Sequence, residues 1–283
     1  MLIAQITDVH VGFDRDGAED RNLARLATLL DRVARGPNRP DAVLITGDLT
    51  EHGDADSFRR LAEMLAAHPA PIHLIPGNHD DRAALLAAFP ETPVEDGFVM
   101  YPIDLGELRV LMLDTLEPGV HGGAFCDRRA DWLSRQLAAA PTRPTVIAMH
   151  HPPAPTGIAW MDPDPAAPWI ARFDAAVRGH DQIVGVLCGH VHRPVATRWR
   201  GSSLIVAPSC APAIALDLSP VDPAQPDGRA LIRCEPPAYA LHAWRGGAFV
   251  SHFEAVGGFH SLARFDDSLQ PMMRTMMAGR PPR

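Results

Sequence analysis

Short apolar runs alternate along most of the chain with helical patterns of leucine and valine. Runs that are bounded by polar, glycine or proline residues predict buried strands, and apolar residues spaced three or four apart predict amphipathic helices. We expect strands at residues 2–7, 42–46, 72–75, 109–114, 145–150 and 183–188. We expect helices at residues 19–35, 54–68, 82–89, 128–140 and 169–177. This alternation is typical of a layered α/β fold.

The C-terminal part of the chain has a different pattern. The apolar runs at residues 204–207, 239–244 and 249–254 have no helices between them, so we expect antiparallel strands of a second sheet. Proline concentrates at residues 141–168 and 208–237, which predicts long structured loops, and such loops are usually functional. We divide the chain into a domain at residues 1–260 and a tail at residues 261–283. The methionine-rich tail has two interpretations, a contact between copies in a homo-oligomer and a frayed end.

Length and composition limit the class of protein. The 283 residues, 46% of them apolar, suffice for one large domain or at most two small ones. No apolar run approaches the roughly 18 residues that a membrane-spanning helix requires, so we expect no membrane partner. Residues 1–7 predict a strand and not a signal peptide, because they lack the charged start and the small-residue cleavage site that a signal peptide has. We therefore expect a cytoplasmic protein.

The charged residues exclude several functions. The chain contains no lysine, so all 26 basic residues are arginine, and neither a phosphate-binding P-loop nor a Schiff-base site is present. With 34 acidic residues the net charge is -8, which argues against a nucleic-acid polymer or an anionic membrane as partner. The four cysteines form no Cys-x-x-Cys pair, so we expect neither a disulfide scaffold nor a zinc–thiolate site. An anionic substrate would need positive charge from elsewhere, and a bound metal could supply it.

Polar side chains directly follow five of the predicted strands. Ligand sites of α/β folds gather at the carboxyl ends of strands, so we expect these side chains to meet at one edge of the sheet. Each motif alone has an ordinary explanation as a turn, a cap or a surface histidine, but five such motifs in this order are improbable by chance. They are Asp8-Val9-His10, Gly47-Asp48, Gly77-Asn78-His79-Asp80, His150-His151 and Gly189-His190-Val191-His192.

These residue types point to a metal centre. Oxygen and imidazole donors without thiolate suit manganese, iron, cobalt or zinc. One carboxylate can bridge two such metal ions that lie about 3.5–4 Å apart. Two metal ions placed in this way lower the pKa of a bound water and hold phosphate oxygens. The sequence therefore predicts a site that holds divalent metal and acts on a phosphate ester.

As a set, the motifs resemble those of the calcineurin-like metallophosphoesterase superfamily, and they span residues 8–192. Within it the chain is similar to class III cyclic-nucleotide phosphodiesterases and their bacterial glycerophosphodiesterase relatives. Four segments carry this likeness: Gly77-Asn78-His79-Asp80-Asp81, His150-His151-Pro152-Pro153, Met161-Asp162-Pro163 and Asp217-Leu218-Ser219-Pro220. The GDxxDRG and GNHE patterns of the protein phosphatases do not match, since Asp48 is followed by Leu49 and Asp80 takes the place of the glutamate.

The resemblance implies two packed mixed β-sheets flanked by helices, a four-layer α/β/β/α sandwich. It implies two divalent metal ions (manganese, iron, cobalt or zinc) and hydrolysis of small phosphodiesters, such as 3',5'-cyclic AMP, by a metal-activated hydroxide. One ion would be held by Asp8, His10, Asp48 and His192, and the second by Asp48, Asn78, His150 and His190, with Asp48 bridging. His79 would contact the phosphate as a transition-state stabiliser or proton donor, and His151 is a candidate for substrate contact or for support of a ligand.

Three alternatives stay open. The same site would suit a glycerophosphodiester or a phosphonate monoester, and a non-catalytic scaffold of the same fold is the reading from another class. The intact Asn78-His79 pair argues against the scaffold. Phe13, Trp160 or Trp169 could stack on a nucleotide base, whereas residues 208–212 offer no histidine for a glycerol pocket. Arg15 and Asn22 are further candidates for the pocket wall. The other histidines are interpreted as surface or satisfied polar groups: His52, His68, His73, His121, His180, His242, His252 and His260.

Overall fold

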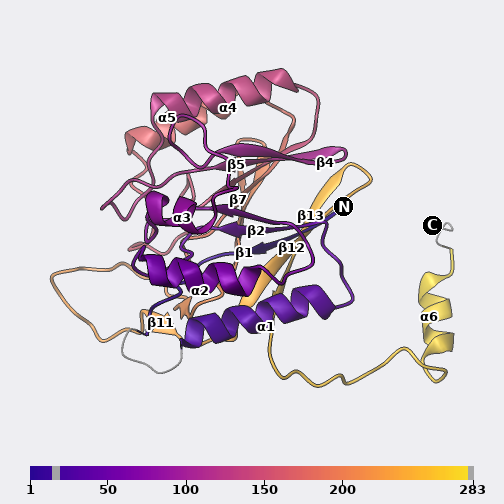
Figure 1. The fold of residues 1–283 in the computed structure, drawn as a ribbon. Coiled ribbons are helices and arrows are strands. Elements are labelled where there is room, and N and C mark those ends of the chain that lie inside the picture. Colours follow the sequence, from indigo (N-terminus) through magenta and orange to yellow (C-terminus); the bar gives the residue numbers. More distant parts are fainter. Residues whose placement is uncertain (15–19, 280–283) are drawn as a thin grey trace.

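The computed structural model describes residues 1–14 and 20–279. Two mixed β-sheets lie face to face in the middle of the molecule, and helices cover their outer faces (Figure 1). The helices α1 (Arg21–Arg35) and α2 (Ala55–Leu65) lie below the first sheet in this view. The helices α4 (Asp127–Ala139) and α5 (Pro168–Val177) lie above the second. The predicted four-layer α/β/β/α architecture is confirmed.

The first sheet has the strand order β13-β12-β1-β2-β3. Its parallel part consists of β1 (Leu2–Ile6), β2 (Ala42–Thr46) and β3 (Ile72–Ile75). The hairpin of β12 (Ala238–Arg245) and β13 (Ala248–Ala255) adds to the free side of β1 in antiparallel register. The prediction that this hairpin belongs to the second sheet is therefore wrong, because an apolar run indicates burial but does not identify the neighbouring strand.

The second sheet has the order β4-β5-β6-β7-β9-β8. Its strands are β4 (Tyr101–Leu105), β5 (Leu108–Leu113), β6 (Thr145–Met149), β7 (Ile183–Cys188), β8 (Val195–Trp199) and β9 (Ser202–Val206). The run at residues 204–207 does join this sheet, but as β9 it pairs in parallel with β7 and antiparallel only with β8. The edge strands β4 and β8 were not predicted. A two-stranded sheet, β10 (Ala213–Ile214) and β11 (Ile232–Arg233), lies beside the two large ones.

The helices next to the first sheet begin at capping aspartates and bury one apolar face. The Asp20 carboxylate accepts the backbone N–H groups of Asn22 and Leu23, and Asp54 does the same for Ser57. In α1 the leucines at 26 and 29 are fully buried against the sheet. Full burial of a leucine side chain stabilises the fold by about 1.5–3 kcal/mol.

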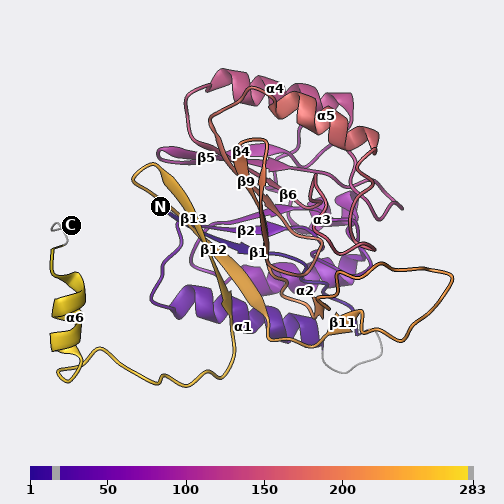
Figure 2. The same ribbon diagram turned by 180° about the vertical axis from the view of Figure 1, so that it is seen from behind.

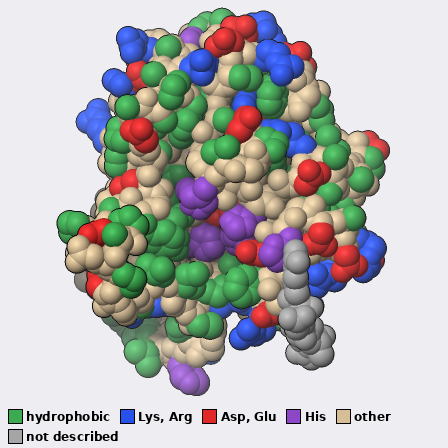
Figure 3. Space-filling model, turned by 90° about the vertical axis from the view of Figure 1, so that its left-hand side faces the viewer, with side chains coloured by type: hydrophobic (Ala, Val, Ile, Leu, Met, Phe, Trp, Pro, Cys, Tyr) green, Lys and Arg blue, Asp and Glu red, His purple; other side chains and the backbone are tan. Residues whose placement is uncertain are grey.

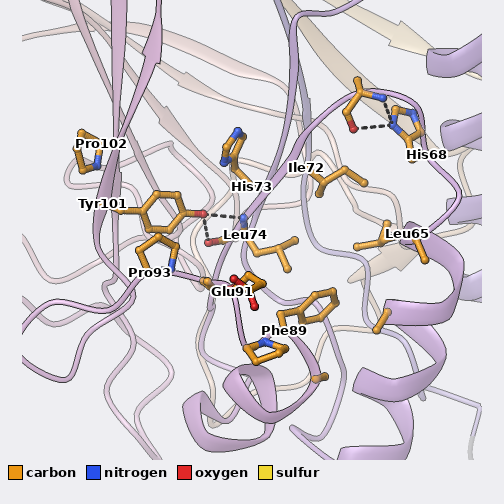
Figure 4. A pocket seen from close by; sticks show the side chains of 16 residues that line it. Leu65, His68, Ile72, His73, Leu74, Phe89, Glu91, Pro93, Tyr101 and Pro102 are labelled. Carbon is orange, nitrogen blue, oxygen red and sulfur yellow. Dashed lines mark hydrogen bonds between the residues drawn. The ribbon is translucent and has the colours of Figure 1, made fainter.

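A tyrosine joins the edge strands of the two sheets. The Tyr101 hydroxyl of β4 donates to the Leu74 carbonyl (2.8 Å) and accepts the Leu74 N–H (2.9 Å), which satisfies the outer backbone groups of β3 (Figure 4). With His73, Phe89 and other side chains of β3, α2 and α3 (Arg82–Ala88), Tyr101 lines a hollow of about 770 Å³. This hollow lies apart from the strand-end motifs.

The chain leaves the two-sheet body after β13. It ends in α6 (Gln270–Met277), which stands apart from the rest of the molecule (Figure 2). None of the residues of α6 is buried. No helix within the described residues has the length and apolar character needed to cross a membrane.

Candidate metal centre

The motifs after β1, β2, β3, β6 and β7 meet at one end of the molecule. Histidine side chains gather there in a hollow with apolar side chains beside it (Figure 3). The described pocket measures about 190 Å³ and is smaller than the hollow at Tyr101. Among its lining residues are His10, Phe13, Asp48, Glu51, His79, His121, Trp160, Met161, His190 and His192.

One set of ligand atoms comes from the ends of β1 and β7. The Nε2 atoms of His10 and His192 lie 3.1 Å apart, and His192 Nε2 lies 3.4 Å from Asp8 Oδ1. Asp48 Oδ2 lies 3.6 Å from His10 Nε2. The Asp8 carboxylate also accepts the backbone N–H of His190 at 3.0 Å from both oxygens, which ties the β7 motif to β1. The structure thus brings together the four residues of the first predicted ligand set.

The second set adjoins the first through Asp48. The same Oδ2 atom lies 3.3 Å from His150 Nε2. The rings of His150 and His190 have centroids 5.3 Å apart. Asn78 is linked to this side of the site through the His151 Nε2 atom, 3.2 Å from Asn78 Oδ1. One carboxylate therefore stands between the imidazoles of two sets, as a bridging ligand must.

The hydrogen bonds of three imidazoles leave their Nε2 lone pairs directed at the site. The Nδ1–H groups donate to Glu51 from His10 (2.7 Å), to the Thr46 carbonyl from His150 (2.8 Å) and to the Pro212 carbonyl from His192 (2.9 Å). His150 Nε2 is buried without any hydrogen-bond partner. Histidines that ligate metals typically donate the other ring N–H in this way. A buried, unpartnered nitrogen among carboxylates fits a metal ligand.

The charges favour a cation between these side chains. Burial acts against ionisation of Asp48, but the neighbouring His150 and His10 hold the pKa of its carboxyl well below the usual value. Burial also acts to lower the pKa of His150, but the Asp48 carboxylate raises it to about 9. Burial lowers the pKa of His190 well below its usual value, so this ring is neutral and has a lone pair to offer to a metal ion. The site stabilises positive charge next to Asp48, as a divalent ion requires.

The backbone carries the predicted ligands in an unusual conformation. Non-glycine residues rarely adopt positive φ, and such residues cluster at functional sites. Among the described residues, seven non-glycine positions have positive φ, and five of them are predicted ligands. The five are Asp8, His10, Asp48, His190 and His192. The sharp turns after the strands aim these side chains back at the site.

Two motif glycines leave room for the ligands of other motifs. A Cβ on Gly77 would lie 2.2 Å from Asp48 Oδ1 and 2.8 Å from His150 Nε2. A Cβ on Gly189 would lie 2.0 Å from Thr7 Oγ1 and 3.0 Å from Asp8 Oδ2. Only glycine allows the loops to approach this closely.

His79 and Asp80 occupy different places although they are adjacent. The His79 backbone N–H donates to Asp48 Oδ1 (2.9 Å), and its Nδ1–H donates to the Glu51 carbonyl (3.0 Å), so the ring lies at the pocket. Asp80 turns inward and accepts the N–H groups of Leu49 (3.0 Å) and Thr50 (2.9 Å). Asp80 therefore locks the loop after β3 to the loop after β2.

A model of the calcineurin-like phosphoesterase family matches residues 1–194, which is more than half of the chain. The chain belongs to this family. A glycerophosphodiester phosphodiesterase, GpdQ of Enterobacter lignolyticus, is 31% identical over 94% of this calcineurin-like phosphoesterase and 92% of the relative. A 3',5'-cyclic adenosine monophosphate phosphodiesterase, CpdA of Pseudomonas aeruginosa, is 32% identical over 74% of the chain and 76% of the relative.

The solved structures confirm the fold of this calcineurin-like phosphoesterase. A dimetal phosphatase from Danio rerio superposes with a TM-score of 0.65 over 90% of this chain and 96% of the other. At 16% identity this likeness concerns the fold alone.

The sequence analysis missed two residues of the site. Glu51 lies three positions after Asp48 in the same loop and holds both His10 and His79. His121, interpreted as a surface or satisfied group, lines the pocket from the loop after β5, with its ring 4.8 Å from that of His190. The rule of polar residues after strands applies to β5 as well, because Asp114 and Thr115 follow it, and it would have directed attention to this loop.

Other candidates are divided between the pocket and the core. Phe13 and Trp160 line the pocket, whereas Trp169 is packed in the core of the second sheet and cannot stack on a ligand. Asn22 lies at the pocket, and its amide donates to the His10 carbonyl (3.1 Å). Arg15 lies outside the described residues.

Proposed function

We propose that this protein is a binuclear-metal phosphodiesterase that hydrolyses small phosphodiesters. The observation that carries the proposal is the Asp48 carboxylate between two sets of imidazoles, next to the buried and unpartnered Nε2 of His150. The phosphodiesterase names of the relatives support it. The intact His79 beside the ligands favours an enzyme over a non-catalytic scaffold.

In this proposal the ligand residues are divided between two metal ions. Asp48, shared by both, would be joined at the first ion by Asp8, His10 and His192, and at the second by Asn78, His150 and His190. Manganese, iron, cobalt and zinc all suit these oxygen and imidazole donors. When bound, such ions lower the pKa of a water towards neutrality and offset the charge of the phosphate.

His79 supplies the proton chemistry. Its Nδ1–H is fixed on the Glu51 carbonyl, and this bond orients the ring so that Nε2 is the atom left for the substrate. A proton on Nε2 makes the imidazole a cation, which stabilises the phosphate in the transition state and can be transferred to the leaving oxygen. Glu51 supports this cation, because its carboxylate lies 3.7 Å from His79 Nδ1.

The pocket wall favours a diester with a planar or apolar ester group, such as a cyclic nucleotide. Phe13 and Trp160 both line the pocket and remain partly exposed, so a base or an aryl ring can stack on them. Residues 211–214 add Ala211, Pro212 and Ile214 to the same described wall, which gives little to bind glycerol hydroxyls. Glycerophosphodiesters stay the alternative because the GpdQ relative aligns over nearly the whole chain, and phosphonate monoesters are a further one.

The test begins with protein stripped of metal by a chelator and assayed on bis(p-nitrophenyl) phosphate. We expect activity to disappear and to return with manganese, and we expect His79→Ala to lower kcat at least 100-fold. His260→Ala, an exposed histidine of the C-terminal part, is the matched control. A panel of 3',5'-cyclic AMP, a glycerophosphodiester and a methylphosphonate aryl ester then ranks the substrates by kcat/KM. Full activity without metal, or no turnover with any ion, contradicts the proposal.

We also propose a cytoplasmic protein, since residues 1–7 lack the pattern of a signal peptide, and a small phosphodiester as its partner. The net charge of -8 argues against a nucleic-acid polymer or an anionic membrane as partner. The tail at residues 261–283 stays a predicted contact between copies. The exposure of Met272, Met276 and Met277 supports this prediction.

A further inference from the structure

His121 lies beside a different predicted ligand from His79. The His121 ring packs near His190, with centroids 4.8 Å apart. The His79 ring packs near His10 at 4.7 Å. Both rings line the same pocket. A phosphate held in this pocket would therefore lie near two imidazoles that are not themselves predicted ligands.

The hydrogen bonds behind His121 begin at Thr115. The Thr115 hydroxyl oxygen accepts the His151 backbone N–H (3.4 Å) and lies 2.8 Å from His151 Nδ1. The His121 carbonyl, 3.2 Å from His151 Nε2, can only accept, so the single ring proton of a neutral His151 is on Nε2. Nδ1 is then the acceptor for the Thr115 hydroxyl proton.

His151 Nε2–H then reaches two acceptors. It lies 3.2 Å from Asn78 Oδ1 and 3.2 Å from the His121 carbonyl. His151 is buried, is absent from the described pocket lining, and lies behind Asn78. This bond fixes which end of the Asn78 amide is the carbonyl, and it leaves the second lone pair of Oδ1 for a ligand role.

The chain of bonds ends at the His121 ring. With Oδ1 assigned, the other end of the Asn78 amide is the NH₂ group, and it lies 3.3 Å from His121 Nδ1. An NH₂ group only donates, so Nδ1 accepts and the ring proton of His121 is on Nε2. This N–H is the end of the chain that is left for the pocket.

We propose that His121 is a substrate-contacting hydrogen-bond donor, oriented by the chain from Thr115 through His151 to Asn78. His121 would donate its Nε2–H to a phosphate oxygen, and His151 and Thr115 would act as positioning residues. The proposal rests on the function proposed above. It explains why a buried histidine lies directly after the predicted ligand His150 without facing the pocket.

The test uses the manganese-loaded protein and inorganic phosphate as the probe. We measure phosphate binding by calorimetry, metal content by elemental analysis, and kcat and KM on bis(p-nitrophenyl) phosphate. We expect His121→Ala to keep two ions per chain and to bind phosphate about 10- to 100-fold more weakly, the range for a hydrogen bond to a charged group. His121→Gln, which keeps an N–H donor, should recover most of this loss.

The positioning residues have their own variants. Thr115→Val removes the hydroxyl and should weaken phosphate binding in the same direction, with kcat reduced more than KM is raised. Thr115→Ser keeps the hydroxyl and should behave like the wild type. Unchanged phosphate binding in His121→Ala overturns the proposal, and so does loss of an ion in that variant. Equal behaviour of Thr115→Val and Thr115→Ser overturns the chain. A wild type without turnover refutes the proposed function, but the phosphate titration still decides the role of His121.

Discussion

The approach of the loop after β3 to Asp48 gives the sharpest prediction. In Gly77→Ala the new Cβ would lie 2.2 Å from Asp48 Oδ1, 2.4 Å from the Asp48 backbone nitrogen and 2.8 Å from His150 Nε2. Carbon atoms prefer separations of about 3.5–4.0 Å from nonbonded neighbours. One of the three atoms belongs to the backbone, so a rotation of side chains cannot relieve the overlap, and one of the two loops must move by about 1 Å.

The expected losses follow from this displacement. Overpacking of this kind costs about 1–3 kcal/mol in the free energy of unfolding, which corresponds to a melting temperature lower by roughly 2–12 °C. A shift of about 1 Å in a bridging ligand lowers catalytic rates by about 100-fold. We expect Gly77→Ala to lose metal as well, since Asp48 and His150 are both pushed from their positions.

The assay compares thermal unfolding with and without manganese, metal content and kcat/KM for Gly77→Ala and Gly258→Ala. The control glycine has nothing within 4 Å of its Cβ position and no positive φ, so the alanine there should be neutral. A Gly77→Ala protein that melts like the wild type and holds two ions would show that the close approach of the loops is not a real constraint.

Two further predictions concern buried polar groups away from the metal site. Burial lowers the pKa of His242 to about 3, so the folded protein binds this proton less readily than the unfolded chain. The contribution of the neutral His242 ring to the free energy of unfolding is therefore fully present above about pH 6.5. As the pH falls from about 6.5 towards 3, this contribution decreases by about 1.4 kcal/mol per pH unit. In urea titrations from pH 8 to pH 5, His242→Gln should lose this acid sensitivity and the exposed-residue control His260→Gln should keep it; equal slopes would contradict the reasoning. Tyr101→Phe leaves both backbone groups of Leu74 without their partner and should cost about 1–3 kcal/mol by denaturant unfolding. Tyr239 is also buried, but its hydroxyl donates to the half-exposed Glu254 carboxylate (2.7 Å), which water can reach when the hydroxyl is removed, so Tyr239→Phe is the control. An equal loss in both variants would refute a special role for the bridge between the sheets.

The central strands could be predicted because their residues are apolar on both faces. The predicted strands at residues 42–46 and 183–188 agree with β2 and β7, and the predicted strand at residues 72–75 agrees with the edge strand β3. The edge strand β4 was missed because Pro102 and Asp104 point to solvent and interrupt its apolar pattern. The position of the β12–β13 hairpin was missed because pairing is decided by which strand side is free, and a single sequence carries no record of that.

The residues of the candidate site could likewise be predicted only in part. Residues that directly follow strands were found from the sequence, because the carboxyl ends of parallel strands bring them together. Glu51 and His121 lie further along their loops, where the path of the backbone decides which side chains return to the site. The division of tasks between His79 and Asp80 likewise depends on loop geometry that spacing alone does not contain.

The left-handed backbone at Asp8, His10, Asp48, His190 and His192 has a consequence for the stability of the molecule. Each such residue costs on the order of 1 kcal/mol in the free energy of folding. Glycine at these positions would relieve that cost and would also dilute the negative charge buried among the loops. Selection for a robust fold alone would therefore remove these side chains. The difference in melting temperature between the metal-free protein and its glycine variants measures the stability that is lost in order to hold ions.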